Sequence, residues 1–291
     1  MAISIPEITK PHAFSLRWIT IIRPLNALLT FISVAIGAYL ASRTTALAWD
    51  WWRVFAAALS ASLILCAGNA FNDLQDQESD RINHPNRPLV QGTMSRTGAW
   101  WVAILCGIIG LILAFSLSAT LGVIALSVSV LLLAYSLILQ SLPLIGNLSV
   151  AIMAALTFPY GGLSVGSIRG TEYPAIFALL FHLGREIVKD LEDRRGDAMA
   201  GFSTLAVRFG VQFPRILASF VLALLIVMTV IPFLTGTYGL TYFFIVLFGV
   251  DGLLVGIIWK LWSSEDARSL RQVSLGLKAG MAIGLLAIIL G

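Results

Sequence analysis

The sequence predicts an all-α, polytopic membrane protein with nine transmembrane helices packed in one bundle. Of the 291 residues, 58% are hydrophobic and only 12% are charged, whereas roughly 25% are charged in an ordinary soluble domain. Apolar stretches of about 20 residues recur along the chain, and each is long enough to cross a bilayer as a helix. Most of the few acidic residues are gathered in two short segments, within residues 73–80 and 186–197.

The expected spans are separated by loops that alternate in character. Loops after the first, third, fifth and seventh spans are short and nearly uncharged, whereas those after the second, sixth and eighth are charged. No low-complexity linker divides the chain, so residues 1–291 are expected to form a single domain. The spans lie near residues 20–42, 53–72, 98–118, 120–139, 145–165, 174–188, 215–234, 240–261 and 277–290.

Basic residues fall on one side of this layout. All but three of the 19 Lys and Arg residues lie in the N-terminal segment or the charged loops. This count assigns Arg185 to the loop after the sixth span and Lys278 to the loop after the eighth. The positive-inside rule then places the N-terminus and both acidic segments in the cytoplasm. We therefore expect an integral protein of the cell's inner or plasma membrane with a cytoplasm-facing site.

The first acidic segment gathers oxygen-bearing side chains on one face of a helix. Its three aspartates follow the spacing i, i+3, i+7, which keeps side chains on one helical face. Bunched carboxylates repel one another unless a cation neutralises them, and carboxylate and amide oxygens are hard ligands that suit Mg²⁺. We expect the metal to be held by Asn69, Asn72, Asp73, Asp76 and Asp80.

The second acidic segment repeats this spacing about 110 residues later. Asp190, Asp193 and Asp197 again share one face of a helix, opposite an apolar face that contacts the bundle. A surface network of i, i+4 ion pairs is the alternative interpretation. Two carboxylate faces that meet across a cavity indicate Mg²⁺ holding a phosphate-bearing substrate.

Cations lie next to both acidic segments. Guanidinium groups suit phosphate oxygens because they donate several hydrogen bonds in a fixed fork. We expect the phosphate-bearing substrate to be bound by Arg81, Arg87, Lys189 and Arg194.

These motifs resemble those of the UbiA superfamily of intramembrane prenyltransferases. The superfamily's first motif is Asn-Asp-x-x-Asp-x-x-x-Asp followed by Arg-Pro, which residues 72–80 and 87–88 match. Its second acidic motif is matched by Asp190, Asp193 and Asp197. The resemblance extends to Arg23-Pro24-x-Asn26, at the start of the first span. Residues 185–193 are most similar to the branch that attaches a second geranylgeranyl chain to a glycerol-phosphate ether lipid.

The resemblance implies a function. It predicts Mg²⁺-dependent transfer of a geranylgeranyl group from a polyprenyl diphosphate to a lipophilic acceptor, geranylgeranylglyceryl phosphate, in ether-lipid biosynthesis. In this scheme Asp193 or Asp197 takes the acceptor's proton, and Arg23 and Asn26 contact substrate. The expected partners are the diphosphate, the acceptor and membrane lipid, with no nucleic acid, and the oligomeric state is left open.

Other functions remain open at this point. Enzymes of the superfamily often carry a Lys in the loop between spans four and five, where this chain has Gln140. An aromatic acceptor of quinone or pigment biosynthesis is therefore an alternative. A cation transporter is another, because membrane acids mark ion paths, although only Asp251 lies deep in a span. A terpene cyclase, which needs no acceptor, is the third.

Overall fold

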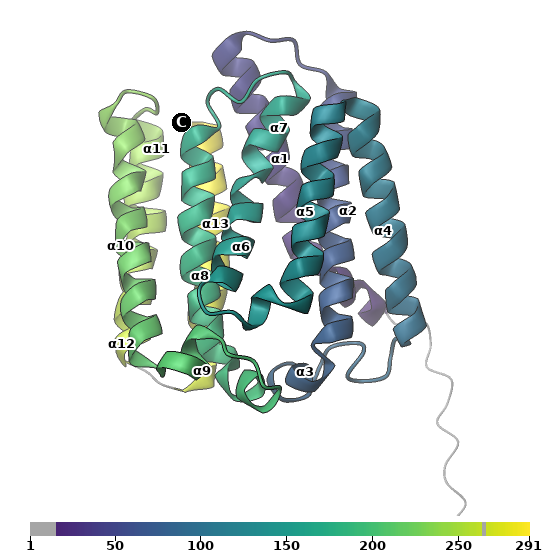
Figure 1. The fold of residues 1–291 in the computed structure, drawn as a ribbon. Coiled ribbons are helices and arrows are strands. Elements are labelled where there is room, and N and C mark those ends of the chain that lie inside the picture. Colours follow the sequence, from purple (N-terminus) through teal and green to yellow (C-terminus); the bar gives the residue numbers. More distant parts are fainter. Residues whose placement is uncertain (1–15, 264–265) are drawn as a thin grey trace, which may run out of the picture.

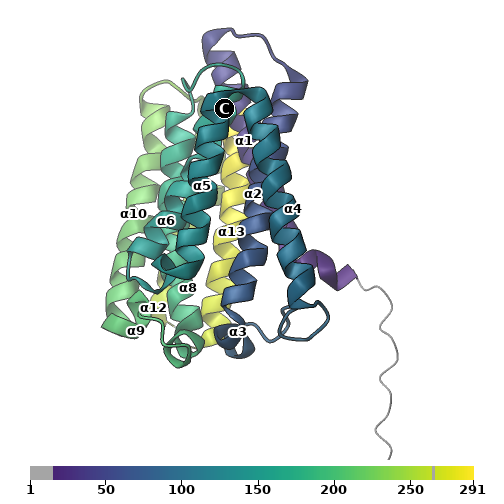
Figure 2. The ribbon, with the colours of Figure 1, turned by 45° about the vertical axis from the view of Figure 1, so that its right-hand side comes forward.

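The computed structural model describes residues 16–263 and 266–291, and all regular structure in these ranges is helical. The long helices run side by side in one bundle (Figure 1), and a view turned by 45° shows the same arrangement (Figure 2). The N-terminal segment expected in the cytoplasm lies, up to residue 15, outside the described residues.

The first half of the bundle contains short helical turns as well as long helices. In chain order it comprises η1 (Leu16–Ile22), α1 (Pro24–Thr45), α2 (Trp51–Gln75), α3 (Gln77–Asn83), α4 (Arg96–Leu117), α5 (Ala119–Leu137), η2 (Leu139–Ser141), α6 (Ile145–Ala155) and α7 (Thr157–Ser164). The second half comprises α8 (Glu172–Met199), α9 (Leu205–Phe209), α10 (Gln212–Leu234), α11 (Leu240–Ile245), the π-helical turn η3 (Val246–Asp251), α12 (Gly252–Ser263) and α13 (Ala267–Leu290).

Side-chain caps fix where several helices begin. Asp50 accepts hydrogen bonds from two backbone amides at the start of α2, at 3.0 and 3.2 Å. Ser95 caps α4, Ser118 caps α5 and Asp266 caps α13 in the same way. Such caps satisfy amides that have no partner inside a helix. Pro24 occupies the first position of α1, where its missing N–H costs no hydrogen bond.

Eight helical segments in the described ranges are long and apolar enough to cross a membrane. The expected count of nine is therefore not confirmed by length and composition. The difference is the expected span 174–188, which lies within α8. This helix has 28 residues, about 42 Å at 1.5 Å per residue, but its second half is rich in charge. Figure 1 shows that α8 runs through the bundle alongside the other long helices.

The outer surface of the bundle is apolar. Along α10, Phe213, Phe220, Val227 and Leu234 recur every seven residues, and all four are exposed. The opposite side of α10 is also apolar and is buried in the core. A helix that is hydrophobic all round belongs in a membrane or a large core. These exposed faces and the eight apolar segments identify an integral membrane protein.

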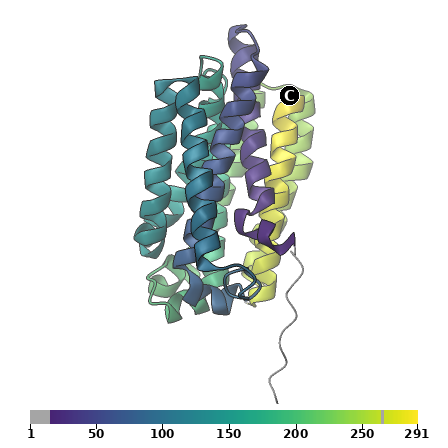
Figure 3. The same ribbon diagram turned by 90° about the vertical axis from the view of Figure 1, so that its right-hand side faces the viewer.

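The two ends of the bundle differ. The short helices α3 and α9 lie at one end together with the start of α1, whereas the C-terminus lies at the opposite end (Figure 1). The last helix, α13, packs against α1 and α8, and Figure 3 shows it beside α1. Lys278 belongs to this helix, and Arg185 belongs to α8. Their assignment to loops was wrong, because both residues lie in continuous helices and within the expected spans 174–188 and 277–290. A charged side chain does not by itself end a helix.

Candidate active site

The first acidic motif is divided between two helices. Asn69, Asn72 and Asp73 lie in the last turns of α2, the helix breaks at Asp76, and Asp80 lies in α3. The expectation of a single helical face is therefore wrong beyond Asp76. The break places α3 across the end of the bundle (Figure 1), where it packs against α8.

The second acidic motif occupies the last turns of α8, which remains helical to Met199. Asp190 accepts hydrogen bonds from the Asn147 side chain at 3.1 Å and from the backbone N–H of Leu205 at 3.3 Å. Asp197 accepts one from the hydroxyl of Ser79 in α3 at 3.1 Å. The fold therefore brings the two motifs together, although they are more than 100 residues apart in the sequence.

The two motifs enclose a small polar cavity of about 50 Å³, which we call the polar chamber. Carboxylates from both motifs line it, together with His84, Arg87 and Gln140. The acidic residues in its wall are Asp76, Asp80, Glu186, Asp190, Asp193 and Asp197.

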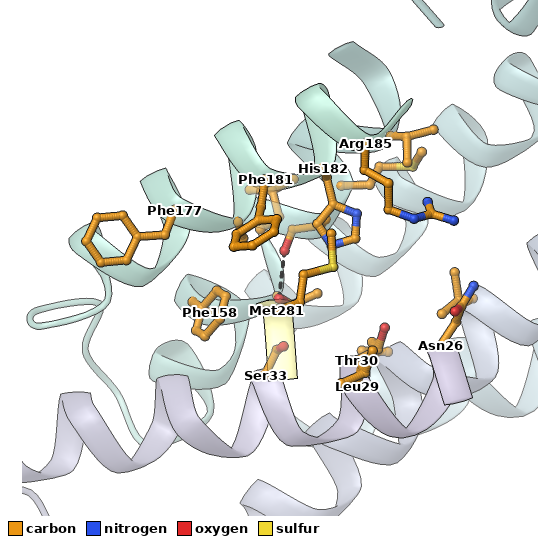
Figure 4. A pocket seen from close by; sticks show the side chains of 18 of the residues that line it. Asn26, Leu29, Thr30, Ser33, Phe158, Phe177, Phe181, His182, Arg185 and Met281 are labelled. Atoms are coloured by element: carbon orange, nitrogen blue, oxygen red, sulfur yellow. Dashed lines mark hydrogen bonds between the residues drawn. The ribbon is translucent and has the colours of Figure 1, made fainter. Parts of the chain in front are cut away.

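A second and larger cavity, of about 280 Å³, extends from the chamber into the bundle. We call it the apolar cavity, because apolar and aromatic side chains, chiefly Leu, Ile, Val, Ala and Phe, make up most of its lining. They come from several helices, including α1, α2, α5, α8, α10 and α13. Tyr135, Glu186 and Lys189 line both cavities and so mark their junction. Figure 4 shows Phe177 and Phe181 of α8 facing α1 across this space.

Two arginines contact the first motif. Arg87 donates a hydrogen bond to Asp73 at 2.9 Å and also contacts Asp80. Arg23 donates to the same Asp73 oxygen at 2.8 Å. Its backbone has a φ of 49°, a left-handed conformation that is uncommon for a residue with a side chain. A strained residue aimed at a buried carboxylate is typical of functional sites.

Cations also contact the second motif. His84 lies 3.3 Å from one carboxylate oxygen of Asp193, and Lys189 lies 3.8 Å from the other. Glu186 pairs with the neighbouring Arg185 at 2.5 Å. Each motif therefore combines buried carboxylates with cations, as expected where a strongly charged ligand has to be bound and oriented.

Burial changes the acidity of two carboxyl groups outside the spans. Burial raises the pKa of Asp80 to about 6, and the neighbouring charges of Asp76 and Asp73 act in the same direction against the opposing effect of Arg87. Burial also raises the pKa of Asp197 to about 6, reinforced by Asp193. Both acids therefore gain from a nearby positive charge, which would favour their ionised forms.

The other predicted residues fall into three sets. Asn69, Asn72, Arg23 and Asn26 line the apolar cavity near the junction. Asp73 lines neither cavity and is held by the two arginines. Two expected substrate-binding residues, Arg81 and Arg194, are exposed and line neither cavity. The structure does not bring this last pair into the site.

Several lining residues were not expected from the sequence. Asn83 of α3 contacts α8, and Arg185 and Lys278 line the apolar cavity. Arg185 and Lys278 could have been recognised in the sequence, because each is a charged residue at helical spacing beside an apolar stretch. Gln140, at the position where a Lys is frequent, donates a hydrogen bond to Asp76 at 2.8 Å. An amide therefore contacts this carboxylate without adding a positive charge.

The donor chemistry of the polar chamber fits a hard divalent cation. Its walls present carboxylate oxygens from both motifs. Within the described ranges, no three acidic, His or Cys side chains are close enough to form a closed metal cage. Mg²⁺ does not require one, because it usually takes one or two carboxylates and completes its shell with water and substrate phosphate.

The fold and the site together define a class of protein, namely helical membrane proteins whose two acidic motifs meet at the end of an apolar cavity. The model of the UbiA prenyltransferase family matches residues 30–281. The chain belongs to this family and is a prenyltransferase.

Relatives cover nearly the whole chain. The digeranylgeranylglyceryl phosphate synthase of Methanopyrus kandleri is 32% identical over 271 residues, which are 93% of this chain and 97% of that protein. The synthase of the same name from Methanothermobacter thermautotrophicus is 30% identical over 274 residues, or 94% and 95% of the two chains.

Solved structures share the fold. One, described as digeranylgeranylglyceryl phosphate synthase in membranes, has a TM-score of 0.73 and 27% identity, covering 94% of this chain and 97% of that one. A UbiA homologue from Archaeoglobus fulgidus, bound to GPP and Mg²⁺, has a TM-score of 0.68 and 18% identity, covering 94% and 99%.

Proposed function

We propose that this protein transfers a geranylgeranyl group from its diphosphate to geranylgeranylglyceryl phosphate in a Mg²⁺-dependent reaction. The observation that carries the proposal is the junction of the two cavities, where acids and cations of both motifs meet an apolar space inside the bundle. A prenyl diphosphate has the same two parts, a charged head and a hydrocarbon tail. The relatives that cover nearly the whole chain are named for this product.

The diphosphate head would lie in the polar chamber, with the tail in the apolar cavity. Arg87, Lys189 and His84 line the chamber and would donate hydrogen bonds to phosphate oxygens. The metal would be held by acids of both motifs, Asp76 and Asp80 on one side and Asp190 on the other. When bound, Mg²⁺ supplies a Lewis acid that neutralises charge on the leaving diphosphate.

The protein's own groups would then direct the reaction. Breaking the bond between C1 and the diphosphate oxygen leaves an allylic cation, which the apolar walls shelter from water. The acceptor's hydroxyl oxygen attacks C1 and loses its proton. Asp197 or Asp193 would accept this proton, because both line the chamber and a carboxylate within reach can act as a general base.

The acceptor assignment has one alternative within the class, an aromatic acid of quinone or pigment biosynthesis. The phosphate acceptor is favoured because the apolar cavity contains cations in addition to those in the chamber. Transport is disfavoured because the acids cluster at one end of the bundle. The deeper Asp251 is buried and accepts a hydrogen bond from Thr229 at 3.1 Å.

We further propose that residues 1–291 form one domain. We also propose that α8 crosses the membrane, which raises the number of spans from eight to nine. The family match over residues 30–281 supports a single unit. With α8 included, the N-terminus and the acidic end of the bundle face the cytoplasm of the cell's inner or plasma membrane, as the distribution of basic residues favours.

The test of this function uses purified protein, Mg²⁺ and radiolabelled geranylgeranyl diphosphate. Geranylgeranylglyceryl phosphate, 4-hydroxybenzoate and homogentisate are offered in parallel, with one sample lacking acceptor and one containing a chelator. We expect label on the glycerol phosphate only, and none after chelation. Label on an aromatic acceptor would replace the acceptor assignment. A labelled hydrocarbon formed without acceptor would indicate a cyclase.

A further inference from the structure

We propose that Lys278, Arg185 and His182 form a second anion site, which binds the phosphate of the acceptor apart from the donor's diphosphate. The inference rests on the proposed function, since it names the part of the protein that recognises the phosphate-bearing acceptor. All three side chains line the apolar cavity. None of them lines the polar chamber.

Lys278 is a charged group in a largely apolar environment. It forms no hydrogen bond or salt bridge with any residue in the described ranges, and it lines the apolar cavity from α13. Its ammonium is repelled by Arg185, Arg23 and Lys189 and attracted by Glu186, the acid that already pairs with Arg185. Grouping cations in a largely apolar space is unfavourable unless an anion joins them.

Arg185 and His182 each add one ring or guanidinium nitrogen that no described residue hydrogen-bonds. In the described structure, Nε of Arg185 and Nδ1 of His182 are fully buried and make no hydrogen bond. Figure 4 shows both side chains extending from α8 toward α1, with Asn26 on the opposite side. Buried polar atoms are nearly always paired, so two unpaired nitrogens on one wall of a cavity indicate a polar ligand.

The charge balance of this wall favours an anion. Glu186 is the acid paired with Arg185, while Arg23 is paired with Asp73 and Lys189 contacts Asp193. The charge of Lys278 is not balanced by such a pair. A phosphate monoester carries close to two negative charges and three acceptor oxygens, which suit the ammonium, the guanidinium and the imidazole.

The position of the site suits transfer to a nearby hydroxyl. Arg185 precedes Asp190 by five residues in α8, a rise of about 7.5 Å along the helix. The acceptor's phosphate is therefore bound deeper in the bundle than the donor's diphosphate. This separation leaves room for the glycerol hydroxyl between the two phosphate groups, next to C1 of the donor.

The test compares Lys278→Met with wild-type protein in steady-state assays of both substrates. We expect the KM for geranylgeranylglyceryl phosphate to rise about tenfold, the lower end for losing a hydrogen bond to a charged group. The KM for geranylgeranyl diphosphate and the kcat at saturating acceptor should stay within about twofold. Lys278→Arg should restore most of the acceptor affinity, because it keeps the charge.

Two controls make the result specific. Lys260→Met removes a lysine that bonds to Gln272 and lines neither cavity, and it should leave both KM values unchanged. Geranylgeranylglycerol, which lacks the phosphate, should bind wild-type protein more weakly than the phosphate form. Its affinity should be the same for Lys278→Met and for wild type.

An unchanged acceptor KM in Lys278→Met would overturn the inference. An equal rise in the donor KM would also overturn it, since the lysine would then hold the diphosphate. If wild-type protein transfers nothing to the glycerol phosphate, the proposed function fails by itself. In that case, equilibrium binding of the acceptor is measured without donor for wild-type protein and for Lys278→Met. The inference stands only if the variant binds the acceptor about tenfold more weakly.

Discussion

Asn83 of α3 donates a hydrogen bond to the backbone carbonyl oxygen of Asp193 in α8, at 2.8 Å. The oxygen of the same amide accepts one from the backbone N–H of Gly196 at 3.1 Å. A single side chain thus uses both ends to join the helix of the first motif to the helix of the second. The separation of the two sets of carboxylates depends on this contact.

Replacing this amide should impair both stability and turnover. We expect Asn83→Ala to destabilise the protein by about 1–2 kcal/mol, the sum for two ordinary hydrogen bonds. Turnover should fall about tenfold or more, because small displacements of reacting groups are costly. Thermal unfolding in detergent and the radiolabel assay measure the two effects. Asn86→Ala is the control, since Asn86 is exposed and its side chain accepts a hydrogen bond from Gln91 at 3.2 Å, away from α8. Equal effects in both variants would contradict the assigned role.

A methyl group at Gly196 should separate the same two helices. A Cβ atom there would collide with the side chain of Asn83, so Gly196→Ala forces this side chain out of its position between α3 and α8. We expect lower activity with little change in membrane insertion. Gly256→Ala is the matched control, because a Cβ atom at Gly256 meets no other atom within 4 Å. Full activity in Gly196→Ala would show that the α3–α8 contact is not needed.

One acid from each motif should be essential. We expect Asp73→Ala and Asp190→Ala each to lower kcat/KM by about 100-fold or more. Losing an outer partner of a metal ligand costs up to about 100-fold, and Asp190 is itself placed among the acids that would hold the metal. Glu78→Ala removes an exposed acid from the same stretch of sequence and should remain active. Size-exclusion profiles establish that the variants are folded. Retained activity in both aspartate variants would refute the proposed metal site.

The arginines of the first motif should differ in importance. Arg87 contacts two buried carboxylates, whereas Arg81 is exposed. We expect Arg87→Lys to reduce kcat/KM for the diphosphate at least about tenfold, because lysine keeps the charge but lacks the guanidinium fork. Arg81→Ala should stay within about twofold of wild type, as surface changes usually do. A larger loss for Arg81→Ala than for Arg87→Lys would restore the role that the sequence suggested for Arg81.

Much of the fold was predictable because apolar length alone marks a helix in a membrane. The expected span 53–72 lies within α2, Trp51–Gln75, and the expected span 215–234 corresponds to α10, Gln212–Leu234. Prediction failed where polar residues enter a helix. The charged second half of α8 was not predicted as helix, although α8 continues to Met199. Helix α13 begins at Ala267, ten residues before the expected span.

The sequence by itself determined the class of this protein, the residue types of its site and their grouping into two motifs. Spacing along one helix is a local property, so Asp190, Asp193 and Asp197 could be placed on one face. Only the tertiary structure decided which charged residues reach the site. Arg87 and Lys189 point inward, Arg81 and Arg194 point to solvent, and Lys278 arrives from a distant helix. Packing between helices sets these directions, and neighbours in space need not be neighbours in the chain.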